Sequence, residues 1–157
     1  MLRVFLVLAL LPVTAAAQGL QVAFAGLDNT ADQPVEIAAD SMSINQDDGI
    51  ATLTGNVVVG QGDMRMAAQR ILIIYTQDGG VSRFEATGGV TVVTPEEEVE
   101  AASATYNLDE DTMLLSGDVL LSQGQSAVSA ERMRVNMDDG TALLEGRVRT
   151  VLQPNSE

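Results

Sequence analysis

The sequence predicts an all-β protein in which four copies of one bent hairpin stack side by side. The first observation is a repeat, because Gly55, Gly88, Gly117 and Gly146 follow one another at intervals of 33, 29 and 29 residues. The second is a polar turn between successive apolar runs, and the third is an alternation of apolar and polar residues that is typical of strands. No helix-period stripe of apolar residues occurs after residue 17. A period near 30 residues indicates a structural repeat.

The first element, residues 1–17, is predicted to be a cleavable signal peptide. Arg3 supplies a positive start, residues 4–13 form an apolar run, and Ala15-Ala16-Ala17 matches a small-x-small cleavage site. The apolar run is too short to cross a bilayer comfortably as a retained helix. An uncleaved membrane anchor is the alternative. Residues 18–31 are expected to form a flexible N-terminal segment.

Each repeat is expected to be a hairpin with a polar turn and a step of small residues. Asp-Gly and Gly-Gly between apolar runs are strong hairpin signals. The four turns are NQDDG (45–49), TQDGG (76–80), NLDED (107–111) and NMDDG (136–140), and the steps are residues 38–39, 67–68, 101–102 and 129–130.

The glycine in the middle of one leg of each hairpin predicts a bend. Gly inside a strand pattern indicates a bulge or a sharp turn of the chain. If both legs bend at the same height, the stacked hairpins form two antiparallel sheets that are joined along a crease. The apolar faces of these sheets then face each other across a long channel. The alternative is that these glycines only close tight turns, although an apolar run continues after each of them.

Composition excludes several classes of function. The formal charge is −14, and −15 once Arg3 is removed, which disfavours a nucleic-acid partner. The chain has no cysteine, no histidine and no G-x-S-x-G motif, so catalysis, redox chemistry and a bound cofactor are not expected. The acidic clusters at 47–48, 109–111 and 138–139 invite a calcium interpretation. Turn chemistry explains them better, so we expect no metal site.

One stretch resembles the beginning of the LptA family, also called OstA-like, of lipopolysaccharide-transport periplasmic proteins. The resemblance covers roughly residues 32–154 and is most specific at its start. It is carried by DQPVEI (32–37), Asp40, Gly49, TLTGNVVV (52–59) and Gln61-Gly62, and then by Val99-Glu100, Tyr106-x-Leu108, LLSGD (114–118) and RTVL (149–152).

This resemblance implies a fold and a function. The fold would be an open β-jellyroll, a V-shaped pair of antiparallel sheets with about sixteen short strands, over residues 32–153, followed by a tail at 154–157. The function would be to carry lipopolysaccharide across the periplasm, between an inner-membrane transport complex and an outer-membrane translocon. Such protomers would also join head to tail through edge strands.

A groove for acyl chains needs a dry, shape-tolerant lining, which flexible methionines suit. Four of the candidates correspond to ligand-facing positions of the family, and the other six rest on strand alternation. For each of them, plain core packing is the alternative. The candidate lipid-binding residues are Val35, Ile37, Ile44, Met64, Met66, Val92, Tyr106, Leu108, Met133 and Val135.

Two alternatives to a soluble carrier remain at this stage. One is a structural β-repeat module with no lipid ligand. The other has the same architecture and is a membrane-anchored component of the transport system or a fragment of the outer-membrane translocon. An open apolar groove favours the carrier, because a soluble monomer rarely exposes so much apolar surface. The predicted edge strands, near 35–37 and 148–152, are templates for strand addition. So acidic a chain cannot hold an anionic glycolipid by general charge attraction, so either the phosphates stay outside in water or only the acyl chains are gripped.

Overall fold

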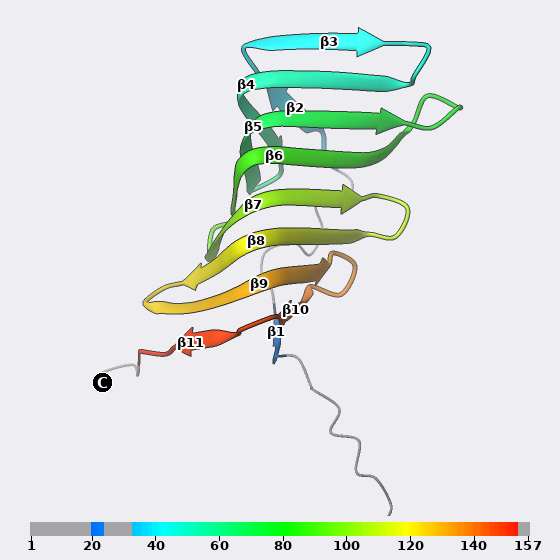
Figure 1. The fold of residues 1–157 in the computed structure, drawn as a ribbon. Coiled ribbons are helices and arrows are strands. Elements are labelled where there is room, and N and C mark those ends of the chain that lie inside the picture. The colour runs from blue at the N-terminus through cyan, green and yellow to red at the C-terminus, as the bar shows by residue number, and fades with distance from the viewer. Residues whose placement is uncertain (1–19, 24–32, 154–157) are drawn as a thin grey trace, which may run out of the picture.

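The computed structural model describes residues 20–23 and 33–153, and these residues form strands and turns (Figure 1). None of the described residues belongs to a helix long and apolar enough to cross a membrane. The strands are β1 (Leu20–Ala23), β2 (Val35–Ala38), β3 (Ser41–Asn45), β4 (Ile50–Gln61), β5 (Met64–Tyr75), β6 (Val81–Val93), β7 (Glu97–Asn107), β8 (Thr112–Gln123), β9 (Ser126–Asn136), β10 (Thr141–Glu145) and β11 (Arg149–Val151).

All of the strands belong to one antiparallel sheet, and most neighbours in the sheet are neighbours in the chain. Its order is β1-β10-β9-β8-β7-β6-β5-β4-β2, with β3 also paired to β4 and β11 also paired to β9. The sheet is open, because the path ends at β1 and β2 without closing. This confirms the all-β prediction and the antiparallel hairpin order.

The long strands β4–β9 bend near their middles, and the bend divides the sheet into two halves. Each ladder between two of these strands changes register at the bend. Examples are the shift between Thr54 and Val57 on β4 and that between Ser116 and Val119 on β8. We name the half that contains β3, β10 and β1 half-sheet I, and the half that contains β2 and β11 half-sheet II. Figure 1 shows the strands curving through this crease. The described residues form eleven strands, and not about sixteen short ones, because β4–β9 run continuously through the bend.

The repeated glycines stand at the crease, as predicted. Gly55, Gly88, Gly117 and Gly146 have φ between +81° and +86°, and the residue after each also has a positive φ. At Gly117 a second requirement applies, because an added Cβ would lie 2.6 Å from the Cβ of Ala102 on the neighbouring strand. The glycine therefore supplies both a left-handed backbone and a close approach of two strands. The alternative of glycines that only close tight turns is wrong.

The hairpin turns of half-sheet I repeat one hydrogen-bond pattern. The side-chain carbonyl of Asn136 accepts hydrogen bonds from the backbone N–H groups of Asp138 (2.9 Å) and Asp139 (3.4 Å). Asn45 and Asn107 make the same pair of contacts in their own turns. In the remaining turn Thr76 replaces asparagine, and its hydroxyl accepts from the N–H of Gly80 at 3.1 Å. The acidic residues after each asparagine are thus explained by local turn structure.

The space between the half-sheets is filled along most of its length by aliphatic and methionine side chains. As alternation predicted, one face of β5 buries Met64, Met66 and Ala68. The corresponding face of β9 and of the turn after it buries Met133, Val135 and Met137. Among the described residues, each strand approaches within 8 Å (Cα–Cα) only the strands that it pairs with in the sheet. Away from the crease, the two half-sheets therefore meet through side chains.

The two ends of the sheet differ from this closed middle. At one end β2 and β3 are exposed along their whole length, and at the other end β11 is exposed too. The sequence predicted edges near β2 and β11, and the structure confirms both. It adds β1, which lies within the segment 18–31 where no strand was predicted; four residues are too few for alternation to identify. The predicted signal peptide and the tail lie outside the described residues.

Candidate functional site

An apolar cavity of about 380 Å³ opens at the β2 end of the molecule. Its wall combines β2, the start of half-sheet II, with the ends of β5, β6 and β7 in half-sheet I. The lining residues are Val35, Ile37, Gln61, Ile73, Tyr75, Val81, Phe84, Tyr106, Leu108 and Asp111. The cavity thus lies between the two half-sheets, at the open end of the space that the core fills elsewhere.

Register explains why apolar side chains are exposed there. Ile37 pairs with Val59, and Ile44 on β3 pairs with Ala51, and both partners are buried on the inner face. Ile37 and Ile44 therefore occupy inner-face positions, but Ile37 is 41% exposed and Ile44 is 61% exposed. β2 and β3 are the last described strands of their half-sheets, and each pairs with β4 alone. An apolar surface of this kind marks a place for a ligand or a partner.

An aromatic pair forms the half-sheet I side of the cavity. The rings of Phe84 and Tyr106 are stacked, with centroids 6.3 Å apart and planes 14° apart. The Tyr106 hydroxyl donates a hydrogen bond of 3.2 Å to Oδ1 of Asp111, which also lines the cavity. Burial, and then the negative charge and the hydrogen bond of Asp111, raise the pKa of Tyr106 to about 12. The tyrosine therefore stays neutral and offers an apolar ring with one polar end.

Alkaline titration should report this environment. The pKa of Tyr106 is about 12 in the folded chain against an ordinary 10.0, so the unfolded chain releases this proton first. Stability from this group is complete below pH 10 and is lost as the pH rises from about 10 through 12. We expect the urea midpoint of the wild type to fall more steeply over this range than that of Tyr106→Phe. Parallel curves for the two proteins would contradict the described burial.

The ten predicted lipid-binding residues fall into three groups. Val35, Ile37, Tyr106 and Leu108, which the family resemblance suggested, line the cavity together. Ile44 lies on the inner face of β3 outside the cavity lining. The other five are at most 5% exposed within the closed core: Met64, Met66, Val92, Met133 and Val135. Alternation identified their face correctly, but it carries no information on what covers that face.

Sequence reasoning missed six residues of the cavity wall. Tyr75 and Val81 flank the turn at 76–80, and they face each other in the ladder between β5 and β6. Their apolar character beside a polar turn was the available signal. The other four residues are part of the cavity wall only because the half-sheets meet at this end: Gln61, Ile73, Phe84 and Asp111.

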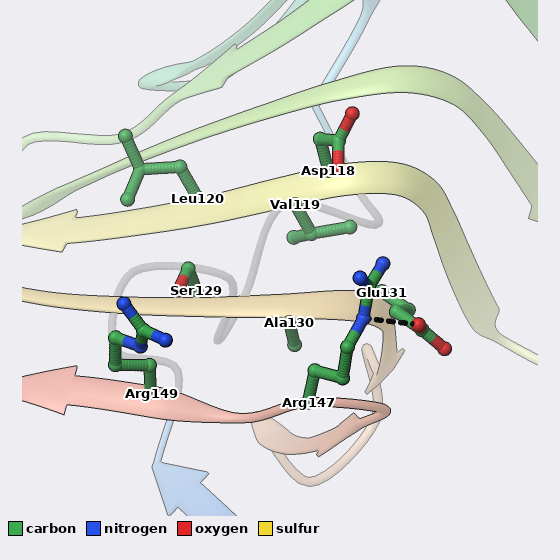
Figure 2. Close-up of a pocket in the computed structure, with 8 residues that line it drawn as sticks. All are labelled: Asp118, Val119, Leu120, Ser129, Ala130, Glu131, Arg147 and Arg149. Carbon is green, nitrogen blue, oxygen red and sulfur yellow. Dashed lines mark hydrogen bonds and ion pairs between the residues drawn. The ribbon is translucent and has the colours of Figure 1, made fainter.

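A second hollow, of about 440 Å³, lies near the crease beside β11 (Figure 2). Several of its residues, such as Leu120 and Ser129, alternate with the buried Val119 and Ala130, so it lies mainly on the outer face. Its charged side chains are Asp118, Glu131, Arg147 and Arg149. Figure 2 shows Arg147 directed toward Glu131, and Arg147 Nε lies 2.6 Å from Glu131 Oε1. This balanced polar surface does not suit acyl chains.

The described residues contain no group of three or more acidic side chains that could hold a metal ion. The site therefore offers shape, apolar surface and one aromatic pair. Chemically, this lining suits an apolar ligand.

Comparison with known proteins gives consistent results. The family model described as "LptA/(LptD N-terminal domain) LPS transport protein" matches residues 36–141. An uncharacterised protein of Rhizobium meliloti is 31% identical, with 90% of this chain and 83% of that protein covered. The lipopolysaccharide export system protein LptA of Escherichia coli K12 is 30% identical, with 85% and 77% covered.

A solved structure supports the fold independently. The crystal structure of LptH, the LptA-homologous periplasmic component of the lipopolysaccharide transport device of Pseudomonas aeruginosa, matches with a TM-score of 0.71 at 17% identity. The match covers 80% of this chain and 99% of that one. At this identity the likeness concerns the fold.

Proposed function

The chain belongs to the LptA/LptD N-terminal domain family of lipopolysaccharide transport proteins, and we propose that it is a periplasmic carrier that holds the acyl chains of lipid A in its apolar cavity. The family consists of transport proteins, not enzymes. The observation that carries the proposal is the inner-face apolar surface at the β2 end, where Ile37 and Tyr106 line one cavity from opposite half-sheets.

Acyl-chain burial supplies enough free energy for such binding. Each buried methylene contributes about 0.8 kcal/mol, so a few methylenes from several chains suffice. Away from the crease the described half-sheets meet only through side chains, so they can swing apart about the crease as longer chains enter. We therefore propose that Ile44 and the core residues Met64, Met66, Val92, Met133 and Val135 extend the site when the halves open. Methionine suits such repacking because its side chain is flexible.

The phosphates of lipid A are proposed to stay in water. The turns of half-sheet I carry acidic residues such as Asp48, Asp109 and Asp139, and the whole chain has a formal charge of −14. A negatively charged rim disfavours burial of an anionic headgroup. Affinity for lipopolysaccharide should therefore come from its chains.

Direct binding tests the carrier against a structural module that takes no lipid. The exported protein is titrated with purified lipopolysaccharide and, in parallel, with the same molecule after removal of its acyl chains. We expect saturable binding of the intact lipid and none of the deacylated one. Equal binding of both would contradict a site for acyl chains, and binding of neither would favour the structural module.

Edge-strand geometry supports a bridge made by head-to-tail self-association. β2 is antiparallel to β4, and β11 is antiparallel to β9. Strands β4–β9 alternate in direction, so β2 and β11 run in opposite directions at the two ends of half-sheet II. A second copy stacked in the same orientation brings its β2 antiparallel to β11, so the two edges can form the same kind of ladder as the rest of the sheet. The same edges would join the inner-membrane and outer-membrane transport components.

Charge on these edges is complementary. Arg149 on β11 has no ion-pair partner among the described residues, and the same holds for Glu36 on β2. Both residues occupy outer-face positions, because successive residues of a strand alternate between the two faces. Glu36 follows Val35 and precedes Ile37, which are both on the inner face. Arg149 pairs with Ser129, the neighbour of the buried Val128. We propose that these two side chains approach each other across the joint between copies.

Charge reversal checks this joint. Arg149→Glu places two negative charges together and should weaken self-association several-fold in sedimentation experiments, and Glu36→Arg should do the same. The double variant should recover most of the loss. Arg70→Glu changes the net charge equally at an exposed position of β5, which pairs only with β4 and β6, and should leave association unchanged. A double variant as weak as the two single ones would contradict the pairing.

A further inference from the structure

The two half-sheets contain different numbers of described strands, because β1 is added to half-sheet I alone. Half-sheet II runs from β2 through parts of β4–β9 to β11. Half-sheet I runs from β3 through the other parts of β4–β9 to β10, and then continues to β1. Without β1 the halves contain equal numbers of strands. With β1, half-sheet I projects one strand beyond half-sheet II at the C-terminal end of the sheet.

β1 lies where a second copy would need to place its β3. β3 is antiparallel to β4. β9 runs opposite to β4, and β10 is antiparallel to β9, so β10 has the same direction as β4. β1 is antiparallel to β10 and therefore has the same direction as β3. If β2 of a second copy pairs with β11, the β3 of that copy arrives beside β10, in the same direction as β1. One edge of β10 cannot accept both strands.

The register of β1 also resembles that of β3. Leu20 and Val22 pair with Leu144 and Ala142, two residues that are buried on the inner face of β10. On β3, Met42 and Ile44 pair with Leu53 and Ala51, which are buried on the inner face of β4. Each short strand thus places two apolar residues, separated by one polar residue, at inner-face register positions.

We infer that β1 is an intramolecular cap, which occupies the β10 edge in the single protein and must leave it before β3 of a second copy can pair there. This inference rests on the proposed head-to-tail self-association. A four-residue ladder at an edge is short, so an incoming strand of equal or greater length can displace it. The cap keeps an unpaired edge from templating uncontrolled growth, and it makes assembly a competition between β1 and β3.

A disulfide lock tests the cap directly, because the chain has no cysteine of its own. One double variant carries Gln21→Cys with Leu143→Cys, and a second carries Val22→Cys with Ala142→Cys. Neighbouring register pairs alternate between hydrogen-bonded and non-hydrogen-bonded, so the two variants sample both geometries. The exported proteins are oxidised at low concentration, and their self-association is measured by analytical ultracentrifugation before and after reduction.

The cap predicts an intramolecular disulfide in at least one variant. It also predicts self-association that is at least about tenfold weaker in the oxidised form than in the reduced form, a ratio that corresponds to about 1.4 kcal/mol. Val22→Pro removes an N–H group and hinders pairing of β1. It should strengthen self-association several-fold, and the described fold from residue 33 onward should remain intact by circular dichroism. The wild type under the same oxidant should not change.

Several results would overturn the cap: a locked form that associates as well as the reduced form, failure of both disulfides, a disulfide between two copies, or weaker association of Val22→Pro. Lipopolysaccharide binding is measured on the same samples. If every form binds lipopolysaccharide but none associates, the cap and the self-association fail while the carrier function stands. If the forms neither bind nor associate, the proposed function fails with them.

Discussion

Replacing Gly117 by alanine is expected to lower the free energy of unfolding by about 3–4 kcal/mol, from the sum of a left-handed backbone and a steric overlap. Gly117 has φ +86°, and an added Cβ would stand 2.6 Å from the Cβ of Ala102. Ala102 belongs to β7, which pairs with β8 on both sides of the bend, so neither strand can move away without breaking the ladder. Urea unfolding with an unchanged slope measures the loss.

Gly89 provides a matched control for this prediction. Its φ is +84°, but an added Cβ would meet nothing within 4 Å. Gly89→Ala should therefore lower the free energy of unfolding only through its left-handed backbone conformation, by about 1–2 kcal/mol. Equal losses at Gly89 and Gly117 would mean that the close approach of the two strands does not limit the crease.

Replacing Ile37 by aspartate is expected to weaken lipopolysaccharide binding by at least about tenfold, because an ionised carboxylate must be desolvated wherever an acyl chain covers it. Ile37 lines the cavity and is 41% exposed, so the charge remains in water in the ligand-free protein. Stability should therefore change little while affinity falls. Titration of both proteins with the same lipopolysaccharide preparation measures the difference.

Val58 is the control for Ile37. It lies on the neighbouring strand, is 39% exposed, and occupies the outer face, between the buried Val57 and Val59. Val58→Asp adds the same charge at a similar exposure outside the cavity, and its affinity for lipopolysaccharide should match that of the wild type. A similar loss of affinity in both variants would indicate a general effect of charge, not an effect within the cavity.

The sequence contained most of the information about the fold. Glycine recurrence located the crease, because a left-handed residue within a strand pattern is costly for anything but glycine and a few polar residues. The turns at 45–49, 107–111 and 136–140 followed from asparagine and aspartate chemistry. β1 was missed because Leu20–Ala23 is too short for alternation to reveal it, and its partner β10 lies at the far end of the chain.

The site was harder to predict than the fold. Ile44 and Met133 show the same alternation, but Ile44 is 61% exposed and Met133 is fully buried. Alternation reports which face a side chain occupies, whereas exposure depends on how the opposite half-sheet lies over it. The four positions suggested by the family resemblance all lie in the cavity wall, because a resemblance brings in tertiary information that alternation lacks. They are Val35, Ile37, Tyr106 and Leu108.

Photo-crosslinking with lipopolysaccharide tests the central claim most directly. A photoreactive amino acid is placed at Ile37 or Tyr106 on the cavity wall, or at Val58 on the outer face, and the purified protein is irradiated with bound lipopolysaccharide. The account predicts adducts from Ile37 and Tyr106 that contain the acyl chains, and none from Val58. Adducts from Val58 alone, or no adducts from either cavity position while lipopolysaccharide is bound, would contradict it.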